Sequence, residues 1–303
     1  MLPIAAVIGL ATVAGLGAEH RWHDWAEMAS SRVLTALLWV FLPVVIFFNI
    51  GTLELTASVG AGIGFAYAAL ATTLVVAYFV GTRLLHLSRP SVGALMGASA
   101  LGNTGYLGLP FTVALFGFDE LPGALAYDVL VSSFALVTVG FSVGAAFGTR
   151  GERARDRLQS FFTRNPPLWA TVAGLLVPVA LTPEWAVDAS RVLVLVILPL
   201  GFFAVGVTLA SEAGASGRFP PRLTAPVAWA VGLKLALVPG VLFALSTLLL
   251  DVPDSYVTQA GMASALNMLV VANAYGLDRA LIAATILYST VLVVAVGTVV
   301  GLA

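Results

Sequence analysis

Long apolar segments alternate along the chain with short polar connections. A helix needs about 20 apolar residues to cross the hydrocarbon core of a bilayer. By this measure the 303 residues contain ten spans and predict an all-α integral membrane protein. The approximate ranges are 1–17, 31–50, 58–82, 91–117, 123–147, 166–182, 187–210, 223–250, 256–275 and 279–302.

Composition supports this class and narrows the chemistry. The chain is 60% hydrophobic and 10% charged, whereas soluble domains carry about 25% charged residues. A net charge of −1 argues against a nucleic-acid partner. The absence of cysteine excludes disulfides and thiolate metal sites. The first residues lack the basic start of a signal peptide, so we expect them to be kept as the first span.

The distribution of basic residues predicts the orientation. Twelve of the fourteen Lys and Arg residues lie in or beside odd-numbered connections, five of them within 149–165, whereas the even-numbered connections are mainly acidic. The positive-inside rule therefore places 149–165 in the cytoplasm and both termini outside the cell or in the periplasm. His20, His23 and His86 fall in predicted cytoplasmic connections, where we expect them to be solvated.

Four short matches relate the two halves of the chain. At offsets of 156 to 165, SRVL at 31–34 returns at 190–193, LP at 42–43 at 198–199, SAL at 99–101 at 264–266, and G-x-D at 117–119 at 276–278. Each half holds five spans, an odd number, so the halves must lie in opposite orientations. This pattern predicts a 5+5 inverted repeat, typical of secondary transporters. The expected units are repeats 1–148 and 166–303, joined by the linker 149–165.

The fourth span contains residues that weaken a helix. The stretch SALGNTGYLGLP at 99–110 includes Gly102, Gly108 and Pro110, and Ala263 lies in the matching part of the ninth span, GMASALNMLVVANAYG at 261–276. An interrupted helix leaves backbone groups without partners, which is tolerated only around a cavity or ligand. We therefore expect both spans to be interrupted and to meet at mid-membrane.

Polar residues at these two breaks are the candidates for substrate binding. They are Asn103, Thr104, Gly105, Ser264 and Asn267. Their amides can donate and accept hydrogen bonds, and a half-helix N-terminus favours an anion such as a carboxylate. In the alternative interpretation, the glycines serve only close packing and Asn103 bonds to a neighbouring helix.

These elements resemble the auxin efflux carrier family of permeases. The resemblance rests on NTGYLGLP at 103–110, MASALN at 262–267 and the two Leu-Pro elements. It implies ten spans in a 5+5 inverted repeat, with a scaffold of spans 1, 2, 6 and 7 that often forms a homodimer. Spans 3–5 and 8–10 would form an elevator-like transport domain for organic anions such as auxin, malonate or malate. The family commonly has proline where this chain has Gly102 and Ala263, and because alanine favours helix we expect a more regular ninth span.

Two ionisable residues lie within predicted spans. Lys234, the single lysine, is in the eighth span, where it either attracts the substrate anion or caps carbonyl groups freed by a helix break. Asp128, near the outer end of the fifth span, is a candidate carrier of a coupling proton; the alternative is an interfacial hydrogen-bonding role. The spans show no carboxylate cluster typical of a sodium site.

The leading interpretation is a secondary transporter of a small organic anion in the cell membrane, coupled to a proton or to sodium. A bile-acid-type sodium symporter shares the inverted-repeat plan. A retinal-type chromoprotein would form a Schiff base with Lys234. In such a protein the lysine is expected in the last of seven spans, whereas this chain has ten spans and an internal repeat. A membrane enzyme is disfavoured because we find no His/Glu metal pair, paired carboxylates or Ser–His pair at bilayer depth. We expect no cofactor and no metal.

Overall fold

The computed structural model describes residues 2–53, 56–149, 166–178, 182–216 and 220–300. The predicted linker 149–165 lies, apart from Thr149, outside the described residues. The regular elements described are all helices, and the one isolated bridge between extended segments joins Gly102 and Ser264.

The first half of the chain, up to residue 149, contains α1 (Leu2–Arg21), α2 (His23–Ala36), η1 (Leu37–Phe41), α3 (Leu42–Ile50), α4 (Ala57–Phe79), η2 (Val80–Leu84), α5 (Arg89–Ala100), η3 (Thr104–Gly108), α6 (Leu109–Phe116), η4 (Phe118–Glu120), α7 (Leu121–Ala126), η5 (Tyr127–Ser133), η6 (Leu136–Gly140) and α8 (Phe141–Phe147). The second half contains α10 (Pro166–Leu176), α11 (Glu184–Ser216), α12 (Ala225–Gly232), η8 (Leu233–Leu237), α13 (Val238–Leu248), α14 (Asp254–Ala260), α15 (Asn267–Tyr275) and α16 (Arg279–Val300).

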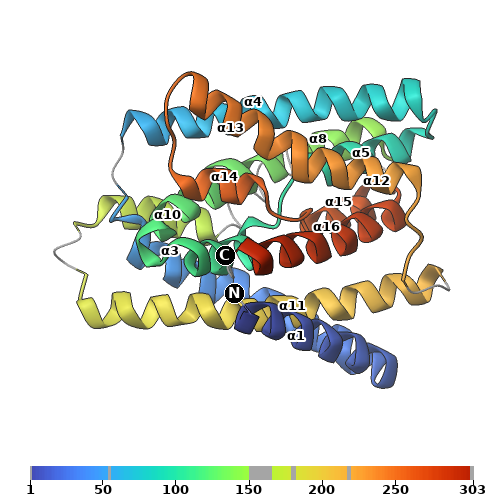
Figure 1. Cartoon of the computed structure of the whole chain (residues 1–303). Helices are drawn as coiled ribbons and strands as arrows, with labels where there is room; N and C mark the ends of the chain where they lie inside the picture. Colours follow the sequence, from blue (N-terminus) through green and yellow to red (C-terminus); the bar gives the residue numbers. More distant parts are fainter. Residues whose placement is uncertain (1, 54–55, 150–165, 179–181, 217–219, 301–303) are drawn as a thin grey trace.

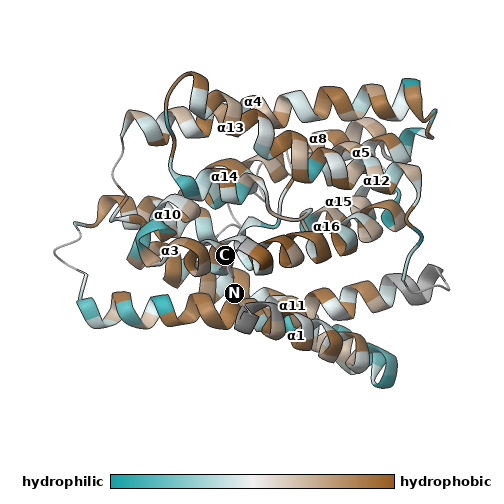
Figure 2. Cartoon of the chain, viewed as in Figure 1, coloured by the Kyte–Doolittle hydropathy of each residue, from teal (hydrophilic) through white to brown (hydrophobic). Residues whose placement is uncertain are grey.

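Six helices of the described chain are long and apolar enough to cross a membrane, as expected of a multi-pass membrane protein. They coincide with six of the predicted spans and run over His23–Ile50, Ala57–Leu84, Phe118–Phe147, Glu184–Ser211, Ala225–Leu248 and Arg279–Val299. Apolar residues extend along these helices, and hydrophilic residues gather near several of their ends (Figure 2). The full count of ten spans remains a prediction.

The helices form two groups. In the lower part of Figure 1, α11 packs against α1, α2 and α3, and α10 packs against α3. In the upper part, α4 packs against α5 and α13, while α12 packs against α5 and α16. The short helices η3, α6, α14 and α15 contact members of one or both groups. The interrupted segments therefore lie within the bundle.

The close approach of α1 and α11 depends on one glycine from each helix. A methyl group at Gly15 would lie 2.2 Å from the carbonyl oxygen of Phe203, and one at Gly206 would lie 2.2 Å from that of Thr12. Small residues let helix backbones approach closely in membranes, where dispersion contacts drive helix association. Because the obstructing atoms belong to the backbone, a side chain at either position would force the helices apart.

The predicted connection at residues 18–30 is helical, which corrects the sequence interpretation. α1 continues to Arg21 and α2 begins at His23, because Ala18 and Ala26 are buried against Val207 of α11. His20 and His86 are exposed as expected. His23 is 61% exposed but contacts Glu19, and its Nε2 lies 4.0 Å from Glu27.

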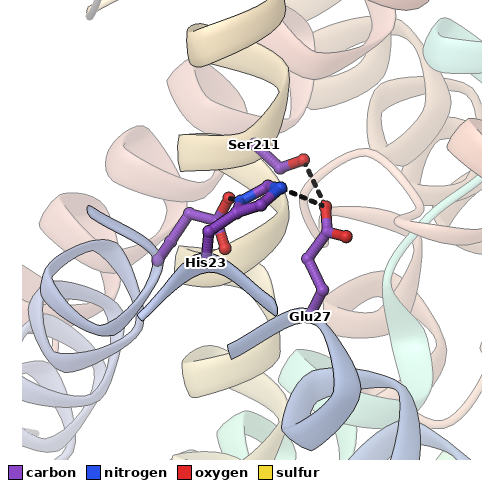
Figure 3. A network of polar contacts seen from close by, with 4 residues as sticks. His23, Glu27 and Ser211 are labelled. Carbon is purple, nitrogen blue, oxygen red and sulfur yellow. Dashed lines mark hydrogen bonds and ion pairs between the residues drawn. The ribbon is translucent and has the colours of Figure 1, made fainter. Parts of the chain in front are cut away.

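The same corner is joined to α11 by a polar contact. Ser211 donates a hydrogen bond of 2.9 Å to Glu27, and Figure 3 shows His23, Glu27 and Ser211 turned toward one another. The turn between α1 and α2 is therefore tied to the C-terminal part of α11.

Candidate functional site

Both segments predicted to be interrupted are interrupted. α5 ends at Ala100, Leu101 is extended, and helical structure resumes at Thr104. α14 ends at Ala260, and α15 begins at Asn267. The expectation that Ala263 keeps the ninth segment more regular is wrong, because tertiary pairing outweighs the helix propensity of one residue.

The two breaks pair with each other through their backbones. The N–H group of Asn103 donates to the carbonyl of Ala263 at 2.7 Å, and that of Ala265 donates to Leu101 at 3.0 Å. Gly102 and Ser264 form the antiparallel bridge between these bonds. Backbone groups lost from two helices are thereby satisfied within an apolar bundle, as they must be.

The second half-helices also end alike. Gly117 follows α6 with φ of 82°, and Gly276 follows α15 with φ of 69°. Positive φ favours glycine, which has no Cβ atom. The two glycines belong to one of the four sequence matches, and the inverted repeat itself remains a prediction.

Lys234 lies close to the points where the first half of each broken helix ends. Its side chain is 1% exposed, and its ammonium group donates a hydrogen bond of 2.7 Å to the carbonyl of Ala260. Its Nζ would lie 3.3 Å from a methyl group at Gly102. The geometry therefore contains the capping contact foreseen from the sequence, and it also places the ammonium beside the break in the fourth segment.

Asp128, in η5, contacts the start of the second half-helix of the fourth segment. The hydroxyl of Thr104 donates a hydrogen bond to its carboxylate, which also lies close to Gly105. Asp128 itself is 7% exposed. The side chain is therefore buried against the crossover, and its contact with Thr104, the first residue of η3, is the hydrogen bond to a neighbouring helix end that the sequence alternative described.

A small cavity joins several of these residues. Its polar lining comes from Thr104, Tyr127, Ser132, Lys234 and Gln259, and Gly102 adds backbone. The volume open to the centre of a water-sized sphere is about 10 Å³, roughly the minimum for one water molecule. In this conformation the cavity is closed to an organic anion.

Asn103 and Asn267 do not line this cavity, so it does not join the two asparagines to Lys234 in one pocket. Asn103 is buried at the break, whereas Asn267 is exposed at the first position of α15. Within the described chain neither amide side chain makes a hydrogen bond. Both remain able to bind a ligand next to a half-helix N-terminus.

Two further sequence candidates also lie at the breaks. Pro110 lies in the first turn of α6, where its missing N–H group costs little. Ser264 is fully buried, its backbone N–H donates to Ser289 at 3.0 Å, and its hydroxyl has no partner in the described chain.

Gln259 is the residue that sequence reasoning missed. Its side chain is fully buried, and neither amide atom has a partner in the described chain. A methyl group at Gly108 would lie 2.0 Å from its Oε1 atom, so Gly108 makes room for it. A glutamine six residues before Ala265, within an apolar span, was the available signal.

The described residues contain one group with metal-type ligands, formed by Glu19, His23 and Glu27, whose ligand atoms lie within 4.8 Å of one another. Nδ1 of His23 contacts Glu19, whereas Nε2 faces Glu27. A metal would need one ring nitrogen directed at the same ion as both carboxylates. The observed arrangement is that of a histidine between two acids.

Comparison with known proteins supports a transport role. The chain is 27% identical over 229 residues to an uncharacterized transporter of Methanocaldococcus jannaschii, a match covering 71% of this chain and 70% of the relative. It is 29% identical over 200 residues to an uncharacterized transporter of Methanothermobacter thermautotrophicus, covering 64% and 62%. No family model matches the chain. Together with the apolar helices, these relatives indicate a multi-pass membrane transporter.

Proposed function

We propose that the protein is a secondary transporter of a small organic anion. The observation that carries this proposal is the backbone pairing of the two broken helices. The pairing places helix ends inside an apolar bundle, where their dipoles and free polar groups can hold an ion. Interrupted helices of this kind form the binding sites of many secondary transporters.

The proposed architecture has ten spans in a 5+5 inverted repeat, as in the auxin efflux carrier family. The scaffold comprises spans 1, 2, 6 and 7, and a homodimer forms through it. Spans 3–5 and 8–10 move as an elevator-like transport domain. The mutual packing of α1, α2, α3, α10 and α11 supports this division.

The proposed anion site lies between Asn103 and Asn267, at the starts of the two second half-helices. The exposed amide of Asn267 gives a ligand its first contact, and the buried amide of Asn103 gives the second. Partial positive charge at the N-terminus of α15 favours a carboxylate. Lys234, behind Gly102, adds positive potential without touching the ligand.

A proton is the proposed coupling ion, with Asp128 as its carrier. Ionised Asp128 occupies the positive end of the η3–α6 half-helix through Thr104 and Gly105 and repels a second anion. Protonation removes that charge, so proton and substrate bind together. Sodium remains the alternative ion and is distinguished by the ion dependence of uptake.

The test is a thermal-shift screen of purified protein against mono- and dicarboxylates. A ligand at 100 times its dissociation constant adds about 2.7 kcal/mol of apparent stability. Replacing Asn103 by Ala removes a charge-assisted hydrogen bond worth roughly 1.5–3 kcal/mol, so we expect at least about tenfold weaker binding with folding intact.

Matched amides of the ligand series act as the control, because they keep the shape of the acids and lack the charge. If no carboxylate stabilises the protein while a neutral compound does, the anion proposal is wrong. If Asn103→Ala melts early but binds normally, the asparagine has only a packing role.

A further inference from the structure

The buried face of α14 carries polar groups with no hydrogen-bond partner in the described chain. Gln259 has two such atoms, Nε2 and Oε1, and Ser255, one helical turn earlier, has its hydroxyl oxygen. Both side chains are fully buried. They face the η3–α6 half-helix and α7, because Gln259 fills the space beside Gly108 and the Ser255 hydroxyl would lie 2.5 Å from a methyl group at Gly123.

The facing surface of α6 contributes a fourth such atom. Thr112 lies one turn after Gly108, on the same face of the helix, and its buried hydroxyl has no partner among the described residues. Three other buried threonines of this chain behave differently. Thr73, Thr171 and Thr285 each donate to the carbonyl four residues earlier, at 2.8, 2.9 and 2.8 Å. The Thr112 hydroxyl is thus left available at the contact between α6 and α14. We call this contact, with Thr112, Ser255 and Gln259, the seam.

These atoms run from the crossover toward the protein surface. At the inner end, Gln259 lines the cavity that also contains Thr104 and Lys234. At the outer end, the backbone N–H of Ser255 donates to Glu120 at 3.3 Å. Glu120 is half-buried, and Asp254, next to Ser255, is exposed. Polar groups therefore lie at both ends of this region and between them.

We propose that this seam binds a file of water molecules between Glu120 and the cavity beside Lys234. Buried polar groups in native proteins are nearly always hydrogen-bonded, to protein or to ordered water. Groups one helical turn apart are about 5–6 Å from one another, a gap that one bridging water spans. Water also supplies both the donors that Oε1 needs and the acceptor that Nε2 needs.

The file would connect the carboxylate of Glu120 to Thr104, the hydrogen-bond partner of Asp128. Such a connection gives protons a route into the bundle. That use rests on the proposed function, whereas the presence of the water does not.

The test compares Thr112→Val and Ser255→Ala with the control Thr285→Val, whose hydroxyl bonds its own helix. In a hydrated seam each seam variant removes a partner of a bound water, so we expect melting temperatures lower by about 2–4 °C than that of the control. In a dry seam the same changes remove an unpaired polar group, and the melting temperature is unchanged or rises.

A second measurement decides the question even if a variant melts early. Because the chain has no cysteine, Ser255→Cys and Thr112→Cys can be probed with silver ions, with the buried Ala98→Cys as control. We expect at least tenfold faster reaction at the seam positions. Reaction at the rate of the control overturns the proposal whatever the melting temperatures show. Neither measurement uses substrate, so failure of the anion proposal in the carboxylate screen is a separate result.

Discussion

The ammonium group of Lys234 donates a hydrogen bond to the carbonyl oxygen of Ala260, the last residue of α14, at 2.7 Å. A cation at the C-terminal end of a helix opposes the partial negative charge there. Asp128 makes the reverse arrangement at the start of η3, through Thr104. Each of these buried charges therefore opposes the dipole of the helix end that it touches.

Lys234→Met should lower both stability and anion affinity. The variant keeps the length of the side chain but leaves the Ala260 carbonyl without its partner, which costs roughly 1–3 kcal/mol. It also removes positive potential behind the proposed site, so a carboxylate should lose more affinity than its amide analogue. Melting temperatures and ligand shifts measured on the same samples separate the two effects. An equal loss for acid and amide would leave only the capping role.

Gly15→Ala should destabilise the packing of α1 on α11. The new methyl group would meet the Phe203 carbonyl oxygen at 2.2 Å, and overpacking of this kind costs about 1–3 kcal/mol. Gly17→Ala, on the same helix, has nothing within 4 Å and is the matched control. We expect a lower melting temperature for the first variant only. Equal melting of the two would show that these backbones are not in close contact.

Gly108→Ala should be destabilising, and Gln259→Ala should rescue it. The added methyl group meets the Gln259 amide, and removal of that amide frees the space. Residues in contact show interaction energies of about 0.5–3 kcal/mol in double-mutant cycles. Gly64→Ala has open space around it and serves as the control. Additive effects of the two changes would contradict the contact.

Asp128→Asn should make anion binding independent of pH. In the proposed mechanism the anion binds when Asp128 is protonated, so the affinity of the native protein falls as pH rises. Linkage of one proton to one anion limits this change to about tenfold per pH unit. The asparagine carries no charge at any pH and should bind the anion at high pH as well as at low pH. Binding isotherms at several pH values test this, and a pH dependence retained in the variant would exclude Asp128 as the carrier.

The predicted orientation can be tested in intact cells. A cysteine at position 152 should resist an impermeant thiol reagent if the linker 149–165 is cytoplasmic. A cysteine at position 254, in the eighth connection, should react. Labelling at 152 without labelling at 254 would show that the chain has the opposite orientation in the membrane.

The interruption of both segments could be predicted from the sequence, and the partner of each break could not. Gly102 and Gly108 predict a weak helix in the fourth segment. In the ninth segment Ala263 favours helix, yet it lies in a break because its carbonyl accepts a bond from Asn103, far away in the sequence. Likewise, a lysine within an apolar span predicts a buried partner or binding site, but that the partner of Lys234 is Ala260 is known only from the fold.

The sequence by itself determined the membrane class, the apolar segments and the places where helices weaken, because these depend on local composition and spacing. Only the tertiary structure decided which polar groups meet. It paired Asp128 with Thr104, left Asn267 exposed, and buried Gln259 without a partner in the described chain. Side-chain pairing depends on how distant helices pack, and each helix offers several faces of almost equal hydrophobicity. Local pattern therefore cannot distinguish the face that holds a ligand from the face that meets lipid.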